Sequence, residues 1–188
     1  SVVFPLISLI LNIQPKDVFK VISASQFWPM LFNSLLATGI ATALSVGIAF
    51  GLAWCVNRTN IRYKQAFSIL FTIPMLIPSI SHGMGLVLLF GDNGLITNFL
   101  HINIGLYGYL GIIIGSILYS FPVAFLMLTD IFKYEDYTTY EAAQVLGLSK
   151  KQQFFTITLP NMKGALISVI FATFTMIFTD YGVPLVVG

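Results

Sequence analysis

Long apolar runs separated by short polar segments dominate the chain. A helix that crosses the hydrocarbon core of a bilayer needs about 20 mainly apolar residues. Four runs reach that length, and they cover approximately residues 32–56, 66–90, 106–132 and 162–180. The pattern therefore predicts four complete membrane-spanning helices. The apolar start, residues 1–11, lacks the features of a signal peptide and predicts the remainder of a fifth, incomplete span.

The chain begins inside one apolar stretch and stops just after another. We therefore expect residues 1–188 to form a single membrane domain that is truncated at both ends. Hydrophobic residues make up 57% of the chain and charged residues 9%, whereas about a quarter of an ordinary soluble domain is charged. The composition excludes a soluble globular protein.

Charge and cysteine content exclude two further classes of function. The net charge of +2 is too small for a nucleic-acid partner, and the basic residues fall in loops instead of on one helix face. Cys55 is the only cysteine, so neither an internal disulfide nor a cysteine cluster can form. Its position near the end of an apolar run predicts a small buried hydrophobic residue.

Basic loop residues predict the orientation of the spans, because lysine and arginine concentrate on the cytoplasmic side. Residues 58–64 and 133–163 contain seven of them, whereas residues 91–105 contain none. We expect residues 58–64 and 134–163 to be cytoplasmic and residues 92–103 to be external. Lys16 and Lys20 would lie outside, against the general trend.

Small residues recur every four positions in two of the runs. The first run contains Gly39, Ala43, Gly47 and Gly51, and the third repeats the spacing with Gly111 and Gly115. Small residues let helix backbones approach closely in a bilayer, where lipid tails give no hydrophobic drive for association. The spacing predicts close helix packing on both faces, with a gap lining a pore as the alternative.

The second run is interrupted by Pro74 and Pro78 and contains His82. Broken helices at membrane depth occur where the backbone faces protein or a water-filled cavity, and ionisable residues there are candidates for function. These three residues are therefore candidates for a translocation path. The alternative is a kinked helix in which His82 donates to a freed carbonyl group.

Asp180 lies 20 residues beyond Pro160, about 30 Å along a helix, and so in the outer half of the bilayer or at its outer face. The carboxylate is a further candidate for the path, or else an interfacial aspartate that caps the break at residues 182–184. No pair of histidines or carboxylates suggests a metal site.

A polar island at residues 134–160 separates the third and fourth runs. Thr138 with Glu141 fits a capping box, which predicts a short helix from Thr139. Gly147 suits the left-handed residue that ends a helix, and Ser149 can cap a second one. Pro160 should close the unit, because the residue before a proline is pushed out of the helical region. The pattern predicts a helix, a tight turn and another helix at a membrane surface.

Seven residues of this island match the EAA signature of the permease subunits of binding-protein-dependent ABC importers, at the same spacing. The alternative is an ordinary amphipathic hairpin with an accidental Glu-Ala-Ala. The resemblance implies an all-α polytopic membrane helix bundle, a MetI-like permease core, whose cytoplasmic hairpin couples the membrane spans to an ATPase. The matching residues are Glu141, Ala142, Ala143, Gly147, Ile157, Leu159 and Pro160.

The resemblance also implies a division of labour among several proteins. The sequence contains no G-x-x-x-x-G-K-[ST] loop, so we expect this chain neither to bind a cofactor nor to hydrolyse ATP. ATP and magnesium would be bound by separate cytoplasmic ABC ATPase subunits. The other implied partners are a second permease copy or homologous half, an external or periplasmic substrate-binding protein, and the lipid of a bacterial-type inner membrane.

Two other functions and the substrate remain to be considered. A secondary transporter driven by an ion gradient would favour paired intramembrane carboxylates and an inverted repeat, which are not evident. An intramembrane enzyme would need a catalytic constellation, whereas His82, Asp130 and Asp180 fall on different runs at different expected depths. The ending, residues 179–188, is similar to permeases for iron(III), polyamines, thiamine, sulfate and 2-aminoethylphosphonate, and most like the last. We therefore expect 2-aminoethylphosphonate as the substrate.

Overall fold

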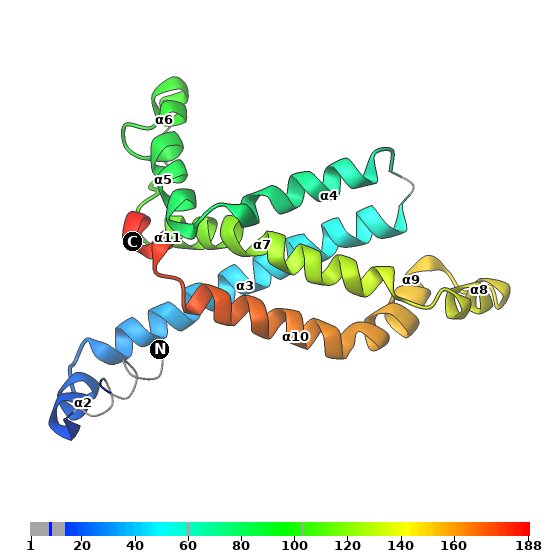
Figure 1. The fold of residues 1–188 in the computed structure, drawn as a ribbon, viewed down its shortest axis with the longest axis horizontal. Coiled ribbons are helices and arrows are strands. Elements are labelled where there is room, and N and C mark those ends of the chain that lie inside the picture. Colours follow the sequence, from blue (N-terminus) through cyan, green and yellow to red (C-terminus); the bar gives the residue numbers. More distant parts are fainter. Residues whose placement is uncertain (1–7, 9–13, 60, 103) are drawn as a thin grey trace. The chain divides into compact units, whose positions relative to one another are not determined.

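The computed structural model describes residues 8, 14–59, 61–102 and 104–188, drawn in colour in Figure 1. Apart from Ser8, the predicted partial span at residues 1–11 lies outside the described residues. All regular structure in the described ranges is helical, which confirms the all-α prediction. The chain divides into two compact units, residues 1–36 and 37–188, and each is described by itself.

The first unit contains α2 (Pro15–Ile22) and the beginning of α3 (Phe27–Arg58). Pro15 stands in the first turn of α2, where its missing N–H leaves no intrahelical hydrogen bond unmade. The apolar side chains of Phe19 and Val21 are exposed. That this unit and the second form a single domain stays a prediction.

Four helical segments in the described ranges are long and apolar enough to cross a membrane: Phe27–Arg58, Ser79–Leu100, Tyr109–Lys133 and Lys150–Phe178. The predicted number of complete spans is therefore confirmed. The first and the third agree with their apolar runs to within several residues, whereas the last begins well before its run.

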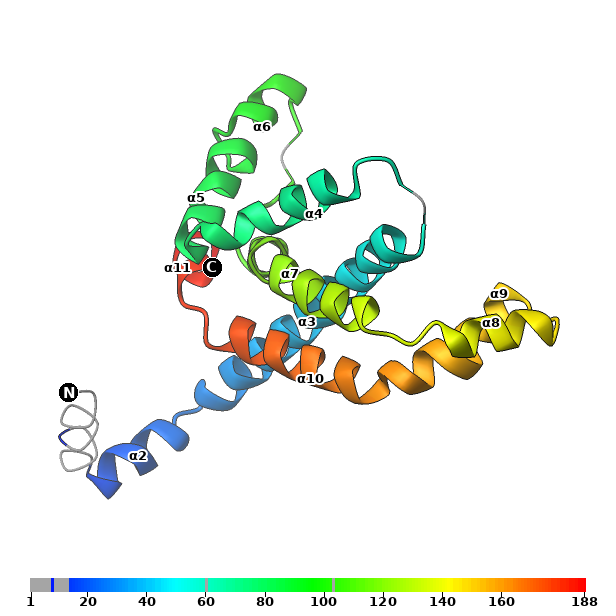
Figure 2. The same ribbon diagram turned by 45° about the vertical axis from the view of Figure 1, so that its right-hand side comes forward.

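The second span differs from its prediction, because residues 66–90 do not form one helix. The chain forms α4 (Lys64–Thr72), a 3₁₀ turn, η1 (Ile73–Leu76), and then α5 (Ser79–Phe90), and Figures 1 and 2 show α4 and α5 running in different directions. Pro74 and Pro78 lack the N–H that a continuous helix requires, and their rings exclude the preceding turn. The candidate span instead includes α6 (Leu95–Leu100), which lies in the predicted external loop.

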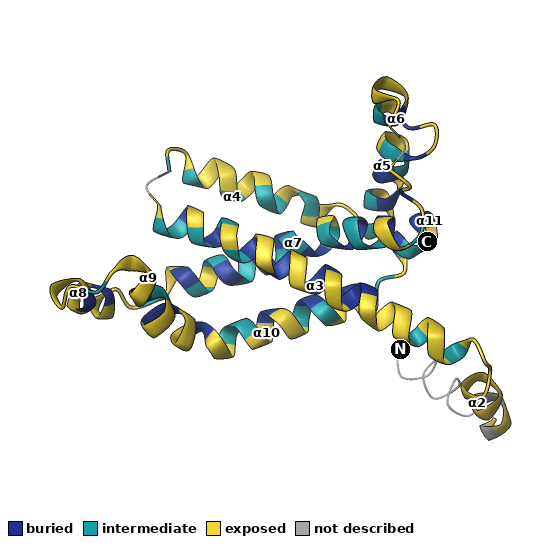
Figure 3. Cartoon of the chain, turned by 180° about the vertical axis from the view of Figure 1, so that it is seen from behind, coloured by how far each residue is buried: buried dark blue, intermediate teal, exposed yellow. Residues whose placement is uncertain are grey.

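The core of the second unit lies between α3, α7 (Tyr109–Lys133) and α10 (Leu159–Phe178), which run side by side in Figures 1 and 2. Figure 3 shows the buried positions concentrated on α7 and on one side of α3. The hydroxyl groups of Ser45 and Ser120 form a buried hydrogen bond of 2.9 Å between α3 and α7. The buried core residues are Val46, Ala49, Ala53, Val56, Ala124, Phe125, Leu128, Phe132, Met162 and Val169.

The predicted packing face of α3 is wrong. A Cβ atom added to Gly39, Gly47 or Gly51 would meet nothing within 4 Å, and these residues are exposed. The buried face is rotated by two positions and carries Ala41, Ser45, Ala49 and Ala53 at the same four-residue spacing. Both faces consist of small residues, so the spacing alone does not select one. Cys55 is also exposed, contrary to its prediction.

The glycines of α7 pack closely, as predicted. A Cβ atom on Gly115 would lie 2.5 Å from Cγ1 of Val183, and one on Gly111 would lie 3.0 Å from Cβ of Val187. Both valines belong to α11 (Gly182–Val187), which packs against α5 and α7 in a second apolar cluster. The amide of Gly108 donates to the carbonyl of Val187 at 2.6 Å. The glycines therefore let α11 lie directly on the α7 backbone.

Candidate functional site: a hairpin between two spans

The polar island forms α8 (Thr138–Val145), a tight turn and α9 (Lys150–Gln153). Gly147 has a φ of +75°, the left-handed conformation predicted for it. The amide of Leu148 returns to the carbonyl of Ala143 at 3.0 Å. Ser149 caps α9 in a reciprocal capping box with Gln152, which confirms its predicted role. The helix, turn and helix prediction is thus confirmed.

The start of α8 differs from its prediction. Thr138 is the first residue of the helix, and its side chain makes no capping hydrogen bond to the backbone. The Asp136 carboxylate instead accepts from the backbone N–H and the hydroxyl of Thr138, both at 2.9 Å. These hydrogen bonds hold the pKa of Asp136 below its ordinary value of 3.8. The amides of Tyr140 and Glu141 donate to the carbonyl of Tyr137, so α8 begins one residue earlier than predicted, and Asp136 binds the amide of its first residue.

The predicted break before Pro160 is also wrong. Leu159 has helical φ and ψ angles of −63° and −43°, and α9 continues through a π-helical segment, η2 (Phe154–Thr158), into α10. A proline inside a helix lacks a donor, and its ring clashes with the carbonyl four residues before it. The wider turns of the π segment directly before Pro160 give the ring more room. The hairpin is therefore joined to the last span without a loop.

A small apolar core holds the hairpin together. It consists of Tyr140 and Ala143 from α8 and Ile157 from η2, with Leu148 packed against them. Two signature residues, Ala143 and Ile157, are thus buried in the hairpin itself. An alanine at 143 lets α8 approach the π segment closely, because a larger side chain would occupy that space.

The opposite face of α8 is apolar and exposed. Ala142, Val145 and Leu146 share this face at spacings of three and four residues, and Val145 and Leu146 are 89% and 77% exposed. Neither Val145 nor Leu146 belongs to the signature, so the sequence analysis missed them. Adjacent exposed aliphatic side chains on a protruding loop are typical of an interaction surface. We name Ala142, Val145 and Leu146 the apolar tip.

The other signature residues are exposed as well. Glu141 lies in the first turn of α8, where a negative charge interacts favourably with the helix dipole, and makes no capping hydrogen bond to the backbone of residue 138 among those described. Leu159 and Pro160 form the first turn of α10. The signature therefore combines residues that build the hairpin with residues that are free to contact a partner.

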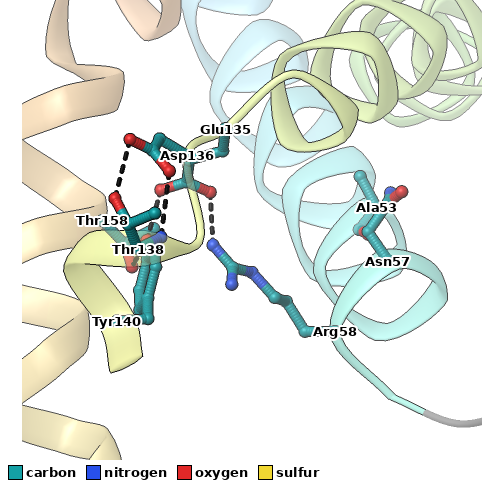
Figure 4. Close-up of polar contacts among 8 residues, drawn as sticks. All are labelled: Ala53, Asn57, Arg58, Glu135, Asp136, Thr138, Tyr140 and Thr158. Carbon is teal, nitrogen blue, oxygen red and sulfur yellow. Dashed lines mark hydrogen bonds and ion pairs between the residues drawn. The ribbon is translucent and has the colours of Figure 1, made fainter. Parts of the chain in front are cut away.

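A buried polar cluster, which sequence analysis missed, joins the hairpin to the first span. Arg58, the last residue of α3, forms an ion pair with Glu135, and the hydroxyl of Tyr140 donates to the other oxygen of that carboxylate. Thr158 and Tyr140 share a hydrogen bond of 2.7 Å between their hydroxyl groups. Figure 4 shows these four residues converging from three parts of the chain. We name them the polar hub.

Burial raises the pKa of the Tyr140 hydroxyl above its ordinary value of 10.0, and its hydrogen bond to Glu135 raises it further. The hydroxyl is therefore protonated at neutral pH and donates to Glu135. An open cavity of about 550 Å³ adjoins the hub, and Arg58, Tyr140, Glu141 and Lys150 are among the residues that line it. The contact of Arg58 with Glu135 also shows that the two basic loops meet at one end of the unit, as expected if both are cytoplasmic.

The four predicted path residues lie at the other end of the second unit. Pro74 is in η1, and Pro78 precedes α5. Nδ1 of His82 lies 3.3 Å from the Pro78 carbonyl oxygen, which is the hydrogen bond that the kinked-helix alternative predicts. The Asp180 carboxylate accepts from the backbone N–H groups of Gly182 at 3.2 Å and Val183 at 3.1 Å, so it caps α11 as its alternative predicts.

His82 of α5 lies beside Tyr119 of α7. The rings of His82 and Tyr119 are 6.2 Å apart between centroids. Nε2 of His82 is buried and has no hydrogen-bond partner among the described residues. The fold thus brings together residues of α5 and α7 that are far apart in the sequence. No group of three metal-ligating side chains occurs in the described ranges.

Comparison with known proteins agrees with this geometry. Residues 43–188 match a family model described as "Binding-protein-dependent transport system inner membrane component". The chain is 31% identical over 182 residues to a putative ferric transport system permease protein, FbpB 1, of Haemophilus influenzae, covering 93% of this chain and 28% of that protein. It is 28% identical to the ferric permease protein FbpB of Actinobacillus pleuropneumoniae, covering 100% of this chain and 29% of that protein.

A third relative is a molybdenum transport system permease protein, ModB, of Azotobacter vinelandii. It is 25% identical over 158 residues, which are 82% of this chain and 70% of that protein. The chain thus spans less than a third of the length of the two ferric relatives and most of the length of the molybdenum relative.

Proposed function

Because this chain belongs to the family of binding-protein-dependent transport system inner membrane components, we propose that it forms part of the translocation path of an ATP-binding-cassette importer. The family resemblance expected from the signature is thereby confirmed, and the chain is a multi-pass protein of the inner membrane. The family does not support the alternative of a secondary transporter. Separate cytoplasmic ATPase subunits bind and hydrolyse ATP with magnesium, and a substrate-binding protein and a second permease copy or homologous half complete the importer.

The apolar tip is the observation that carries the coupling role. Val145 and Leu146 extend from a hairpin whose own core already holds α8 in position. When a partner covers exposed aliphatic side chains, the free energy of the complex falls by about 25 cal/mol for each Å² of apolar surface removed from water. The ATPase subunit is the partner that the family supplies at the cytoplasmic face. The signature residues then act in two ways, Ala143, Gly147 and Ile157 by shaping the hairpin and Glu141 and Ala142 by bordering its contact surface.

The path residues have a separate part in this proposal. Pro74 and Pro78 break the helix in the second apolar run. The break leaves backbone polar groups at membrane depth without intrahelical hydrogen bonds. His82 has an unpaired buried ring nitrogen, and Asp180 caps α11, which packs against α5. We infer that these groups face the passing substrate in the assembled importer.

The proposed substrate is ferric iron, because the two ferric permeases named above cover nearly all of this chain. Carboxylate and imidazole groups, as in Asp180 and His82, are suitable donors for iron. None of the three relatives named above is a permease for 2-aminoethylphosphonate, so they do not support the substrate expected from the chain ending.

The experiment uses the full-length permease, co-expressed with its ATPase subunits and binding protein. We expect Leu146→Ser to reduce co-purification of the ATPase subunit about 10-fold, the size expected for truncating an interface hot spot. Gly147→Val should act in the same direction, since a β-branched residue at φ +75° costs about 1 kcal/mol or more. Leu95→Ser is the matched control, because Leu95 is 71% exposed on α6. Normal ATPase binding by both hairpin variants would refute the docking role.

The same complex, reconstituted in proteoliposomes, reports the substrate. Uptake is measured with ferric iron, sulfate, molybdate, spermidine and 2-aminoethylphosphonate as separate solutes, with and without ATP. We expect ATP-dependent uptake of ferric iron. Uptake of another solute would reject iron but keep the importer, whereas ATP-independent uptake driven by an imposed ion gradient would reject the importer.

A further inference from the structure

The polar hub connects the hairpin to two membrane spans at once. Its ion pair is largely shielded from water, since the side chains of Arg58 and Glu135 are 13% and 8% exposed, and the remaining exposure of Arg58 is to the open cavity. Glu135 lies between α7 and α8 in the chain, whereas Arg58 ends α3. The pair therefore spans 77 residues of sequence and fixes the end of the first span against the entry to the hairpin.

The hub continues from Glu135 through Tyr140 to the last span. Tyr140 donates to Glu135, so the hydroxyl of Thr158 donates to Tyr140 in the bond of 2.7 Å. Thr158 is fully buried and immediately precedes α10. A displacement of α8 therefore reaches both the end of α3 and the start of α10 through directional hydrogen bonds.

The surroundings make this connection stiff. The guanidinium carbon of Arg58 lies 4.1 Å from the ring centroid of Tyr140 and 4.9 Å from that of Tyr137, distances at which a cation is attracted to an aromatic ring. In a site of low dielectric constant, hydrogen bonds strengthen, and leaving one charge of a pair unpartnered is strongly unfavourable. The hub therefore resists separation when the hairpin is moved.

We propose that the polar hub transmits displacement of the ATPase-bound hairpin to α3 and α10, with Arg58, Glu135, Tyr140 and Thr158 as positioning residues. This inference rests on the proposed function, because it requires a partner that moves the hairpin. The hub and the apolar tip have distinct tasks. The tip binds the ATPase subunit, and the hub converts motion of the hairpin into motion of the spans. Ala143 and Ile157 also join α8 to η2, so the part specific to the hub is the connection to α3.

The test measures the number of solute molecules imported per ATP hydrolysed by the full importer in proteoliposomes. The solute is whichever of the five solutes tested above the unmodified complex imports. Tyr140→Phe removes one hydroxyl and keeps the aromatic ring beneath Arg58. We expect this ratio to fall about 5- to 10-fold, which lies within the roughly 2- to 30-fold range for residues that couple distant sites. Co-purification of the ATPase subunit should not change. Tyr137→Phe is the matched control, because Tyr137 contacts Arg58 through its ring.

A second pair of variants tests the charge. Arg58→Gln should lower the ratio by a similar factor, and Arg58→Lys should recover part of it, because the ammonium group keeps the charge but not the forked geometry. Arg62→Gln removes an exposed arginine from the same loop and should leave the ratio unchanged. The guanidinium carbon of Arg62 lies 5.6 Å from the ring centroid of the adjacent Tyr63. The combination of Arg58→Gln with Tyr140→Phe should lower the ratio little more than either alone, because both break one network.

The outcomes separate the two levels of inference. If the unmodified complex shows no ATP-dependent import, the proposed function fails and the hub falls with it. If that complex imports solute while Tyr140→Phe and Arg58→Gln keep its ratio of solute to ATP, the hub alone is refuted. Loss of ATPase co-purification in both variants would also refute transmission, because the hub would then only shape the docking surface.

Discussion

Two helices of the second unit carry small residues at the same four-residue spacing, yet only one uses its glycines for packing. On α7, a Cβ atom at Gly115 would lie 2.5 Å from Val183, whereas on α3 a Cβ atom at Gly47 would meet nothing within 4 Å. On α3 the contact with α7 is made by the neighbouring stripe that contains Ser45 and Ala49. The difference shows that small-residue spacing marks faces that are able to pack, and that the partner selects among them.

The partner of each face explains the selection. Gly115 faces α11, a short helix whose Asp180 cap and valines hold it directly on the α7 backbone. The stripe on α3 that is buried carries Ser45, which gains a hydrogen bond to Ser120 of α7. A glycine face offers no such bond. In a bilayer, hydrogen bonds between helices add to the stabilisation from close packing. The serine-containing stripe therefore stabilises the contact between α3 and α7 more than the glycine stripe would.

Gly115→Ala should have the largest effect on this comparison. Its methyl group would overlap Val183 and approach Leu86 at 3.4 Å, and overpacking of this kind costs typically about 1–3 kcal/mol. We expect a lower midpoint of thermal unfolding in detergent, measured by size-exclusion chromatography after heating. Adding Val183→Ala should restore much of the loss, because it removes the overlapping methyl groups. An unchanged midpoint for Gly115→Ala would show that α11 does not pack on α7.

Gly47→Ala should have a smaller effect of opposite sign. The added methyl group meets no neighbour, and alanine is favoured over glycine inside a helix by roughly 0.5–1 kcal/mol. We expect an unchanged or slightly higher unfolding midpoint in the same assay. A marked decrease for the chain in detergent would mean that the glycine face of α3 is packed after all.

Gly83→Ala should have the smallest net effect, because two contributions oppose each other. A Cβ atom there would lie 3.0 Å from Cβ of Val186, so α11 must shift by a small amount, while the helix gains the preference of alanine over glycine. We expect a change within about 0.5 kcal/mol, seen as a midpoint close to that of the unmodified chain. A loss as large as that of Gly115→Ala would indicate that α11 is held equally tightly against α5 and α7.

In the candidate site too, the sequence predicts some features correctly and others wrongly. The left-handed Gly147 and the Ser149 cap are local features, set by residues within three or four positions, and the sequence predicts them correctly. The predicted start of α8 is wrong, because Asp136 accepts from both the amide and the hydroxyl of Thr138 and the threonine side chain caps no later amide. The π segment before Pro160 was missed because proline usually ends a helix.

The amino-acid sequence is sufficient to predict the class of the protein, the number of complete spans and the presence of a capped hairpin with a family signature. These features follow from hydrophobic length, from backbone preferences of single residues and from short-range hydrogen bonds. Three further features depend on how the chain folds: which face of α3 is buried, the exposure of Val145 and Leu146, and the contact of Arg58 with Glu135 across 77 residues. Such outcomes depend on pairs of surfaces, and a buried ion pair is stable only where the fold removes both charges from water together and satisfies their hydrogen bonds.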